Sequence, residues 1–148
     1  MRALGGGLVH GARETRDRRE LREGPAENPT AYRACFEHAL DAMVLVDGEG
    51  RIVAANAAAA ELSGDAAADL VGRSADAFLE PTFDLRAALR ELLLRAAVER
   101  VVVLRRTDGA RRLVELGARA AVAEDWHLLV LRDVTQRRRL ERELRHAE

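Results

Sequence analysis

Aromatic residues are scarce in this sequence of 148 residues: Tyr32, Phe36, Phe78, Phe83 and Trp126. So few aromatic rings argue against a binding site that stacks an isoalloxazine or a purine ring. The single cysteine, Cys35, excludes an internal disulfide. The glycine-broken start does not look like a secretory signal, and no apolar run approaches the roughly 20 residues that span a bilayer. We therefore expect a cytoplasmic protein without membrane contact.

An excess of charge of one sign is also lacking. The 24 basic residues, all arginine, nearly balance the 25 acidic ones, so there is no electrostatic footprint of a nucleic-acid binder. Motifs for phosphate loops, zinc proteases and serine hydrolases are absent, as is any outstanding carboxylate pair. We expect no enzymatic activity, no metal site and no nucleic-acid partner. The length and the 48% hydrophobic content fit one domain with tails.

Three segments follow one another along the chain. Residues 1–28 are rich in glycine and mixed charge, with too few apolar residues to offset the entropy of ordering, and predict a disordered or partly helical leader. Residues 29–135 predict a folded domain, and residues 136–148 a connector helix. From Pro29 on, Ala31, Cys35, Ala39 and Leu40 recur at helical spacing, which predicts a short amphipathic helix. We expect Cys35 to be a small buried apolar residue.

Five strands are predicted. Met43–Val46 and Ile52–Ala55 flank a glycine-containing turn and form a hairpin. Residues 101–134 supply three more, the first two joined by a turn at Thr107–Ala110. In the middle one, apolar residues alternate from Val114 to Val122, as in a sheet with one buried face. The runs Met43–Val46 and Leu128–Leu131 do not alternate, which places these two strands side by side in the centre.

Helices are predicted between the second and third strands. The segment from Asn56 to Leu79 indicates short helices interrupted at Gly64 and Gly72. Residues Phe83–Val98 form the longest predicted helix, with one apolar stripe: Leu85, Ala88, Leu89, Leu92, Leu93 and Ala96. Two strands, a group of helices and three strands indicate an α+β fold with a five-stranded antiparallel sheet.

Several motifs in this order resemble the PAS family of sensor domains, from about Ala31 to Arg138. They are FEHALDAMVLVDGEGRIVAANAAAAELSGDAAADLVGR, then RTDGARRLVELGARA and LRDVTQRRRLE. The resemblance implies strand order 2-1-5-4-3, helices on one face of the sheet, and flanking N- and C-terminal helices. It matches Asn56 to the asparagine that caps the first short helix, and Gly64 and Gly72 to the glycines flanking the second. Ordinary cap and turn chemistry is the simpler interpretation of all three residues.

Asp133 and Thr135 match the family's D-x-T signature at the end of the last strand. Their chemistry is readable without the family: Thr135 can cap the following helix, and Asp133 can pair with Arg137 or Arg138. Together they would fix the angle at which the helix leaves the sheet. A joint that sets this angle can also change it, so we predict these four residues to be the signal-relay site.

The resemblance also implies that a haem, a flavin or a small metabolite could lie between sheet and helices. None of the four histidines (His10, His38, His127 and His146) lies where the family's haem ligand usually does. Cys35 is not placed like the flavin-adduct cysteine, and the motif N-C-R-F-L-Q is absent. We expect His38 and His127 to be surface or packing residues. The small side chains of residues 57–60 leave two options open, close packing or a small apolar ligand, and no cofactor is identified.

The last predicted helix carries Leu140, Leu144 and Ala147, spaced four and three apart like a coiled-coil seam. It is too short to be stable alone. Its sequence resembles the connector that precedes the dimerisation helix of sensor histidine kinases, with His146 in the connector rather than at the phosphorylated position. We expect a homodimer that relays a signal to a histidine kinase, or else a diguanylate cyclase, beyond residue 148 or in a partner. The alternatives are a ligand-binding protein, an adaptor with a filled core, and a charged helix end without a role.

Overall fold

The computed structural model describes residues 28–147. The predicted leader lies outside this range except for Asn28, and so does His10. Helix α2, Pro29–His38, starts after Asn28, whose side-chain oxygen accepts a hydrogen bond from the backbone N–H of Thr30 at 3.0 Å. The prediction for this segment is wrong in two respects. Cys35 is exposed, because α2 buries none of its side chains, and the helix ends before Leu40, which is 99% exposed.

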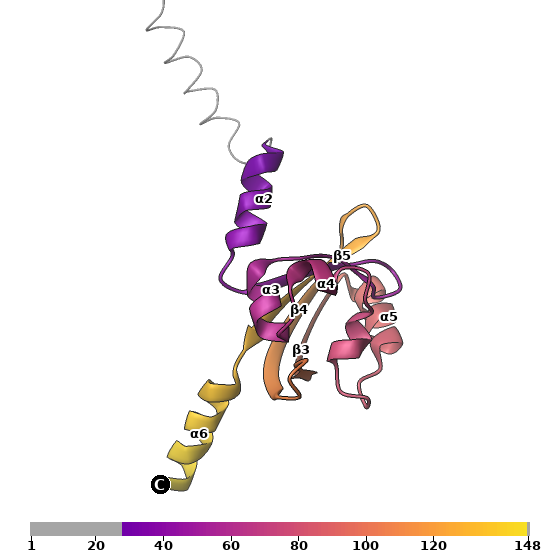
Figure 1. Cartoon of the computed structure of the whole chain (residues 1–148). Helices are drawn as coiled ribbons and strands as arrows, with labels where there is room; N and C mark the ends of the chain where they lie inside the picture. The colour runs from indigo at the N-terminus through magenta and orange to yellow at the C-terminus, as the bar shows by residue number, and fades with distance from the viewer. Residues whose placement is uncertain (1–27, 148) are drawn as a thin grey trace, which may run out of the picture. The chain divides into compact units, whose positions relative to one another are not determined.

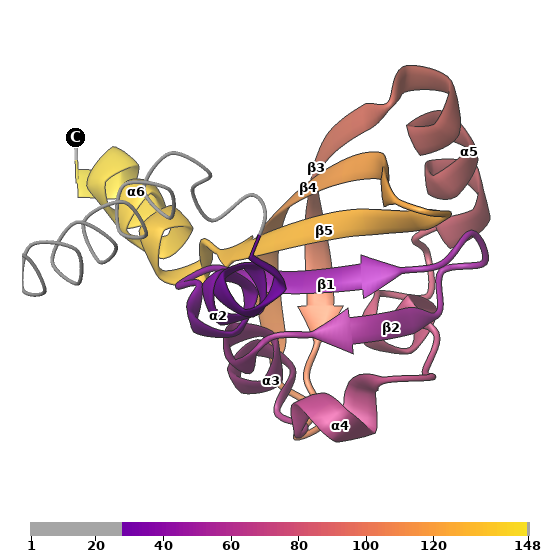
Figure 2. The same ribbon diagram turned by 90° about the horizontal axis from the view of Figure 1, so that it is seen from above.

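Residues from Phe36 onward form a compact unit built on one sheet. Its strands are β1 (Ala42–Val46), β2 (Ile52–Ala55), β3 (Ala97–Arg105), β4 (Arg111–Ala123) and β5 (Trp126–Asp133). They lie in the order β2-β1-β5-β4-β3 (Figure 2), and every neighbouring pair is antiparallel. The predicted strand order and the central position of β1 and β5 are confirmed.

The hairpin between β1 and β2 closes as its sequence predicts. One side-chain oxygen of Asp47 accepts hydrogen bonds from the backbone N–H groups of Glu49 and Arg51, each at 2.9 Å. Gly50 adopts φ +85°, and a Cβ atom there would lie 2.8 Å from a methyl group of Leu85. Glycine at this turn therefore satisfies both the left-handed backbone and the close approach of the next long helix.

Helices α3 (Ala57–Ser63), α4 (Ala67–Leu70) and α5 (Leu85–Arg95), with the 3₁₀ turn η2 (Ala75–Phe78), pack against one face of the sheet. Helix α6 (Thr135–Ala147) follows β5 directly (Figure 1). Gly64 and Gly72 flank α4 as predicted, with φ +85° and +90°. None of the helices in residues 28–147 has the length and apolar character needed to cross a bilayer.

Helix α5 is shorter than the predicted Phe83–Val98. It begins after Asp84, whose carboxylate accepts a hydrogen bond from the N–H of Ala87 at 3.0 Å. It ends at Arg95 because Ala96 turns left-handed at φ +67° and directs the chain into β3, so Val98 is a strand residue. The apolar stripe is also narrower than predicted, since Leu93 and Ala96 are exposed while Leu89 and Leu92 are buried.

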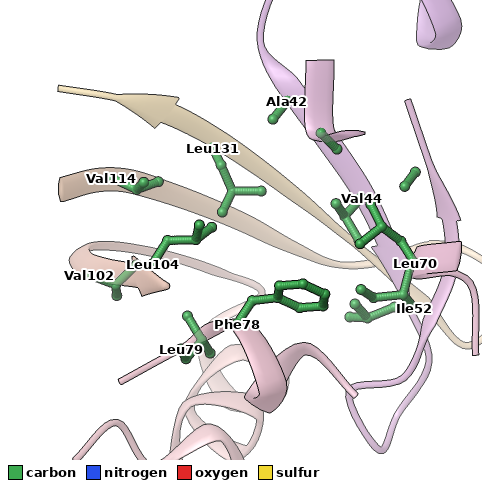
Figure 3. Packing of buried hydrophobic residues seen from close by; sticks show 13 residues of the cluster. Ala42, Val44, Ile52, Leu70, Phe78, Leu79, Val102, Leu104, Val114 and Leu131 are labelled. Carbon is green, nitrogen blue, oxygen red and sulfur yellow. The ribbon is translucent and has the colours of Figure 1, made fainter. Parts of the chain in front are cut away.

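The core lies between the sheet and these helices. Alternate residues of β1 and β4 point into it, and Val46 and Val114 are fully buried. Figure 3 shows Phe78 of η2 reaching toward Ile52 and Leu70 across the same space that Leu131 enters from β5. The alternation predicted for β4 breaks at Ala121, which has φ +50°, and Val122 beyond it is 46% exposed.

Candidate functional site

The end of β5 is joined to β4 before α6 begins. The backbone N–H of Leu113 donates a hydrogen bond to the hydroxyl oxygen of Thr135 at 2.8 Å, and its carbonyl accepts one from the N–H of Val134 at 2.9 Å. Val134 is 2% exposed, and the hydrogen bond between Leu113 and Thr135 is partly buried. We call Leu113, Asp133, Val134 and Thr135 the junction.

Asp133 completes the junction. One carboxylate oxygen accepts hydrogen bonds from the backbone N–H of Thr135 at 2.9 Å and from its hydroxyl at 2.6 Å. Asp133 therefore caps α6, because it accepts a hydrogen bond from the first backbone N–H of the helix. The sequence predicted this capping role for Thr135. The hydroxyl of Thr135 instead accepts a hydrogen bond from Leu113 of β4. The predicted pairing of Asp133 with Arg137 or Arg138 is wrong. Its carboxylate faces Arg112 of β4, with 3.8 Å between Oδ2 and Nε.

The two arginines predicted for the relay differ in their surroundings. A guanidinium nitrogen of Arg137 lies 2.6 Å from a carboxylate oxygen of Glu115 on β4, and its Nε lies 3.9 Å from Glu141, one turn along α6. Arg138 joins the first turn through its backbone N–H, bonded to the carbonyl of Val134 at 2.9 Å. Its side chain is exposed and forms no ion pair with residues 28–147. The first turn of α6 is thus linked to β4 by Arg137.

Asn56 ties the beginning of the unit to the same end of the sheet. It is fully buried, and its oxygen accepts the predicted capping bond from the N–H of Ala59 and a second bond from the N–H of Met43, both at 2.9 Å. Its NH₂ group donates to the carbonyls of Phe36 at 2.9 Å and Asp41 at 3.0 Å. Every hydrogen-bonding direction of the amide is used, so its role extends well beyond a helix cap.

The strands that begin and end the unit meet beside the junction. Ala42 of β1 pairs with Leu131 of β5, and the guanidinium of Arg132 donates to the carboxylate of Asp41 at 3.2 Å. That hydrogen bond, with the attraction of Asp41, raises the pKa of the Arg132 side chain. The segment before β1 and the start of α6 are therefore both held by the same end of the sheet.

The predicted seam on α6 is exposed. Leu140 and Leu144 are 52% and 67% exposed, and Ala147 is exposed as well. Among the residues that the structure describes, none covers this stripe. An apolar stripe on a charged helix is a feature that a second helix could cover.

An apolar cavity of about 90 Å³ lies between the sheet and helices α3, α4 and α5. Leu116, Ala118, Leu129 and Leu131 of β4 and β5 line its sheet side. Of the four alanines at positions 57–60, only Ala59 lines it. One charged side chain reaches the lining, that of Arg100 on β3.

The residues present do not fit a haem or a flavin. Sites for larger ligands occupy roughly 300–1,000 Å³, far more than this cavity. No histidine or cysteine lines it, and residues 28–147 contain no cluster of three potential metal ligands. His127 is 3% exposed and accepts a hydrogen bond from the N–H of Ala121 at 3.0 Å, which is a packing role. His38 lies at the exposed end of α2, and His146 is exposed on α6.

Sequence reasoning missed the partners on β4 and before β1. Leu113, Arg112 and Glu115 contact Thr135, Asp133 and Arg137, respectively, from about 22 positions earlier in the chain. Asp41 contacts Arg132 from 91 positions earlier. Leu113 acts through its backbone, so its side chain carries no signal.

Comparison with known proteins supports the family that the sequence resembles. The family model of the PAS fold matches residues 36–139. Sporulation kinase E of Bacillus subtilis (strain 168) is 25% identical over 137 residues, which are 92% of this chain, and the chain spans only about a fifth of that kinase (19%).

Solved structures share the fold as well. The PAS domain of an HTR-like protein from Haloarcula marismortui is 25% identical, with a TM-score of 0.64 over 79% of this chain and 98% of that one. A domain of a sensory box sensor histidine kinase/response regulator from Geobacter sulfurreducens is 23% identical, with a TM-score of 0.67 over 75% and 98%. Since the family model covers more than half of the sequence, the chain belongs to the PAS family.

Proposed function

We propose that this PAS domain is a non-catalytic sensory module that relays a ligand or partner signal from its helix-covered face through α6 to an output domain. The observation that carries the proposal is the attachment of Val134 and Thr135 to Leu113, which links the start of α6 to two strands at once. The similarity to sporulation kinase E supports a histidine kinase as the output, with a diguanylate cyclase as second choice. The proposal includes a cytoplasmic location.

The relay needs only a short path. Leu131 lines the cavity two residues before Asp133, and Leu116 lines it three residues after Leu113. Protein interiors are closely packed, so a change in the cavity displaces its lining rather than being absorbed. Small shifts of β4 against β5 would change how the junction holds α6, and thereby favour one of two helix directions.

Dimerisation through α6 is the second part of the proposal. The helix has 13 residues, near the lower limit for a helix that is stable in isolation. Burial of Leu140, Leu144 and Ala147 against a second copy would stabilise it and would deliver two helices together to the output domain. The ion pair of Arg137 with Glu115 would then set where each helix starts relative to its sheet.

A pair of leucines on α5 allows a matched test of the relay. Leu92 is 2% exposed and lines the cavity, whereas Leu94 is 87% exposed on the same helix. We expect Leu92→Ala to change the amide chemical shifts of Leu113, Thr135 and Arg138, and Leu94→Ala to leave them unchanged. If the shifts caused by Leu92→Ala stop at α5 and its direct neighbours, the relay has no physical path and the proposal fails.

A second candidate is a binding protein whose stored ligand is itself the function, which the apolar cavity favours. A third candidate function is that of a dimerisation adaptor with a filled core. Native mass spectrometry and an absorbance spectrum of the purified protein separate them, because a retained ligand supports the binding protein and an empty dimer supports the adaptor. The coding sequence beyond codon 148 shows whether a kinase follows.

A further inference from the structure

Arg100 occupies a position on β3 that normally holds an apolar side chain. Val98 and Val102, two residues to either side, are buried, and its cross-strand partner Leu116 lines the cavity. Arg100 therefore points to the helix-covered face of the sheet. Arginine is among the residues least often found inside a protein, so its presence there requires a reason.

The guanidinium of Arg100 lies at the rim of the cavity, between β3 and α5. Its Nη2 contacts the Oε2 of Glu91 on α5, and its Nη1 donates to the carbonyl of Glu99 at 3.0 Å. The side chain of Arg100 is 44% exposed and that of Glu91 is 28% exposed. The aliphatic stem thus lines the apolar cavity while the charge remains at its edge.

Glu91 is already a carboxylate bound to this guanidinium, and it has a second partner. The Nη1 of Arg95, one turn further along α5, lies 3.4 Å from its other carboxylate oxygen. If Arg100 turned to a different carboxylate, Glu91 would keep the ion pair with Arg95. The exchange would therefore leave no buried charge without a partner, which is the usual obstacle to breaking such a pair.

The size of the cavity limits what can accompany that carboxylate. Apart from Arg100 and Ser63, its lining is made of apolar residues and one glycine. An apolar cavity of roughly 150 Å³ can hold benzene, with its six carbons, so a cavity of about 90 Å³ holds roughly three to four carbons. A chain of about three carbons fits this volume, whereas a long fatty chain does not.

We propose that the cavity binds short aliphatic monocarboxylates, with an apolar tail of about three carbons in the cavity and the carboxylate on Arg100 in place of Glu91. A guanidinium binds a carboxylate through two parallel hydrogen bonds, which gives the rim its selectivity for acids. This binding would supply the signal for the proposed sensory function, and the following consequence rests on that function. Release of Glu91 removes the ion pair between the side chains of α5 and β3, and this is the change that the junction would then sense.

Butyrate, 1-butanol, butylamine and acetate are suitable probes, titrated into the full chain labelled with ¹³C at its methyl groups. We expect saturable shifts of the Leu89 and Leu92 methyl groups with butyrate. Butyrate should bind roughly tenfold more tightly than butanol because of the charged hydrogen bonds, and roughly tenfold more tightly than acetate because of two further buried methylenes. Butylamine should not bind. No saturable shift with butyrate, or equal affinity for butyrate and butanol, overturns the proposal.

Three variants identify the residues responsible. Arg100→Gln should abolish the preference of butyrate over butanol, while Glu91→Gln should tighten butyrate binding several-fold because the competing carboxylate is gone. The second result is a gain that a damaged fold would not produce. Arg90→Met, at an exposed position beside Glu91, is the matched control and should bind like the parent. Unchanged affinity in Glu91→Gln, or an unchanged preference in Arg100→Gln, contradicts the proposed exchange.

The same titration separates this inference from the relay. Butyrate shifts at Leu89 and Leu92 without any change at Leu113 and Thr135 would support the binding site and contradict the relay. If butyrate does not bind while Leu92→Ala still alters the junction, the relay stands and the ligand class is wrong.

Discussion

Leu113 and Thr135, 22 positions apart, share a hydrogen bond of 2.8 Å between the backbone N–H of the first and the hydroxyl oxygen of the second. The carbonyl of Leu113 binds the neighbouring Val134 at 2.9 Å. Both the backbone N–H and the backbone carbonyl of one β4 residue are therefore hydrogen-bonded to the segment that follows β5. The direction in which α6 starts depends on two strands rather than on one flexible connection.

Replacement of Thr135 by valine keeps the shape of the side chain and removes its hydroxyl. We expect the free energy of unfolding to fall by about 1–2 kcal/mol, because the partly buried N–H of Leu113 loses its partner. Chemical denaturation measures this difference. Gln136→Ala, at the exposed next position, is the control and should change stability by less than about 0.5 kcal/mol.

The ion pair between Arg137 and Glu115 should matter less for stability than Thr135. Both side chains are partly exposed, 54% and 39%, so we expect a coupling energy of about 0.2–1 kcal/mol that decreases in high salt. A double-mutant cycle with Arg137→Ala and Glu115→Ala measures it. A coupling that does not respond to salt would show that the pair is more shielded than its exposure indicates.

Asn56 should be the most sensitive polar residue of the unit. Asn56→Ala leaves two N–H groups and two carbonyls without their partner, and we expect a loss of about 2–4 kcal/mol. Asn56→Asp can still accept from both N–H groups but, when ionised, cannot donate to either carbonyl, so it should also destabilise the fold. Asn28, which caps α2 at an exposed position, is the matched control, with an expected loss of at most about 1 kcal/mol for Asn28→Ala.

The pair of Glu91 and Arg100 predicts a pH dependence. The hydrogen bond from Arg100, with the attraction of Arg100 and Arg95, holds the pKa of Glu91 below its ordinary value. A lowered pKa in the folded state stabilises the protein above the ordinary glutamate pKa of about 4.3, and this stabilisation is lost as the pH falls through the folded value. The destabilisation caused by Glu91→Gln should thus be larger at pH 7 than in acid. In an Arg100→Met background, most of that difference should vanish.

Substitutions on the seam of α6 test the proposed dimer. We expect Leu140→Arg and Leu144→Arg each to shift the protein toward the monomer in sedimentation experiments, because arginine at a seam position places like charges opposite each other in the paired helices. The circular dichroism of the sheet should be retained. Arg139→Ala, on the exposed surface of the same helix, should leave the dimer intact, and a parent chain that is monomeric at every concentration would remove this part of the proposal.

Much of the fold could be predicted because its signals are local. The unbroken apolar runs of β1 and β5 placed these strands in the centre of the sheet, and the glycines at the turns marked the hairpins. The end of α5 could not be predicted, because Ala96 adopts a left-handed backbone conformation that glycine, rather than alanine, usually marks in a sequence. The apolar spacing continues past it into β3, so the periodicity extended the predicted helix to Val98.

The site was less predictable because its contacts are distant in the chain. Asp133 was assigned an arginine four or five positions away, whereas the sheet brings Arg112 to it from the neighbouring strand. Arg100 was given no role, since it fell between the predicted helix Phe83–Val98 and the strand predicted to follow from residue 101. Only the pairing of β3 with β4 and the cover of α5 show that it faces the cavity.

Amide hydrogen exchange at Arg138 tests the attachment of α6 most directly, since this N–H closes the first turn of the helix on the carbonyl of Val134. We expect it to be protected nearly as well as the amides of β4 and β5, and to lose that protection in Thr135→Val but not in Gln136→Ala. Exchange at Arg138 as fast as in the last turn of α6, and unaffected by Thr135→Val, would show that the helix is not held by the sheet and would contradict the relay.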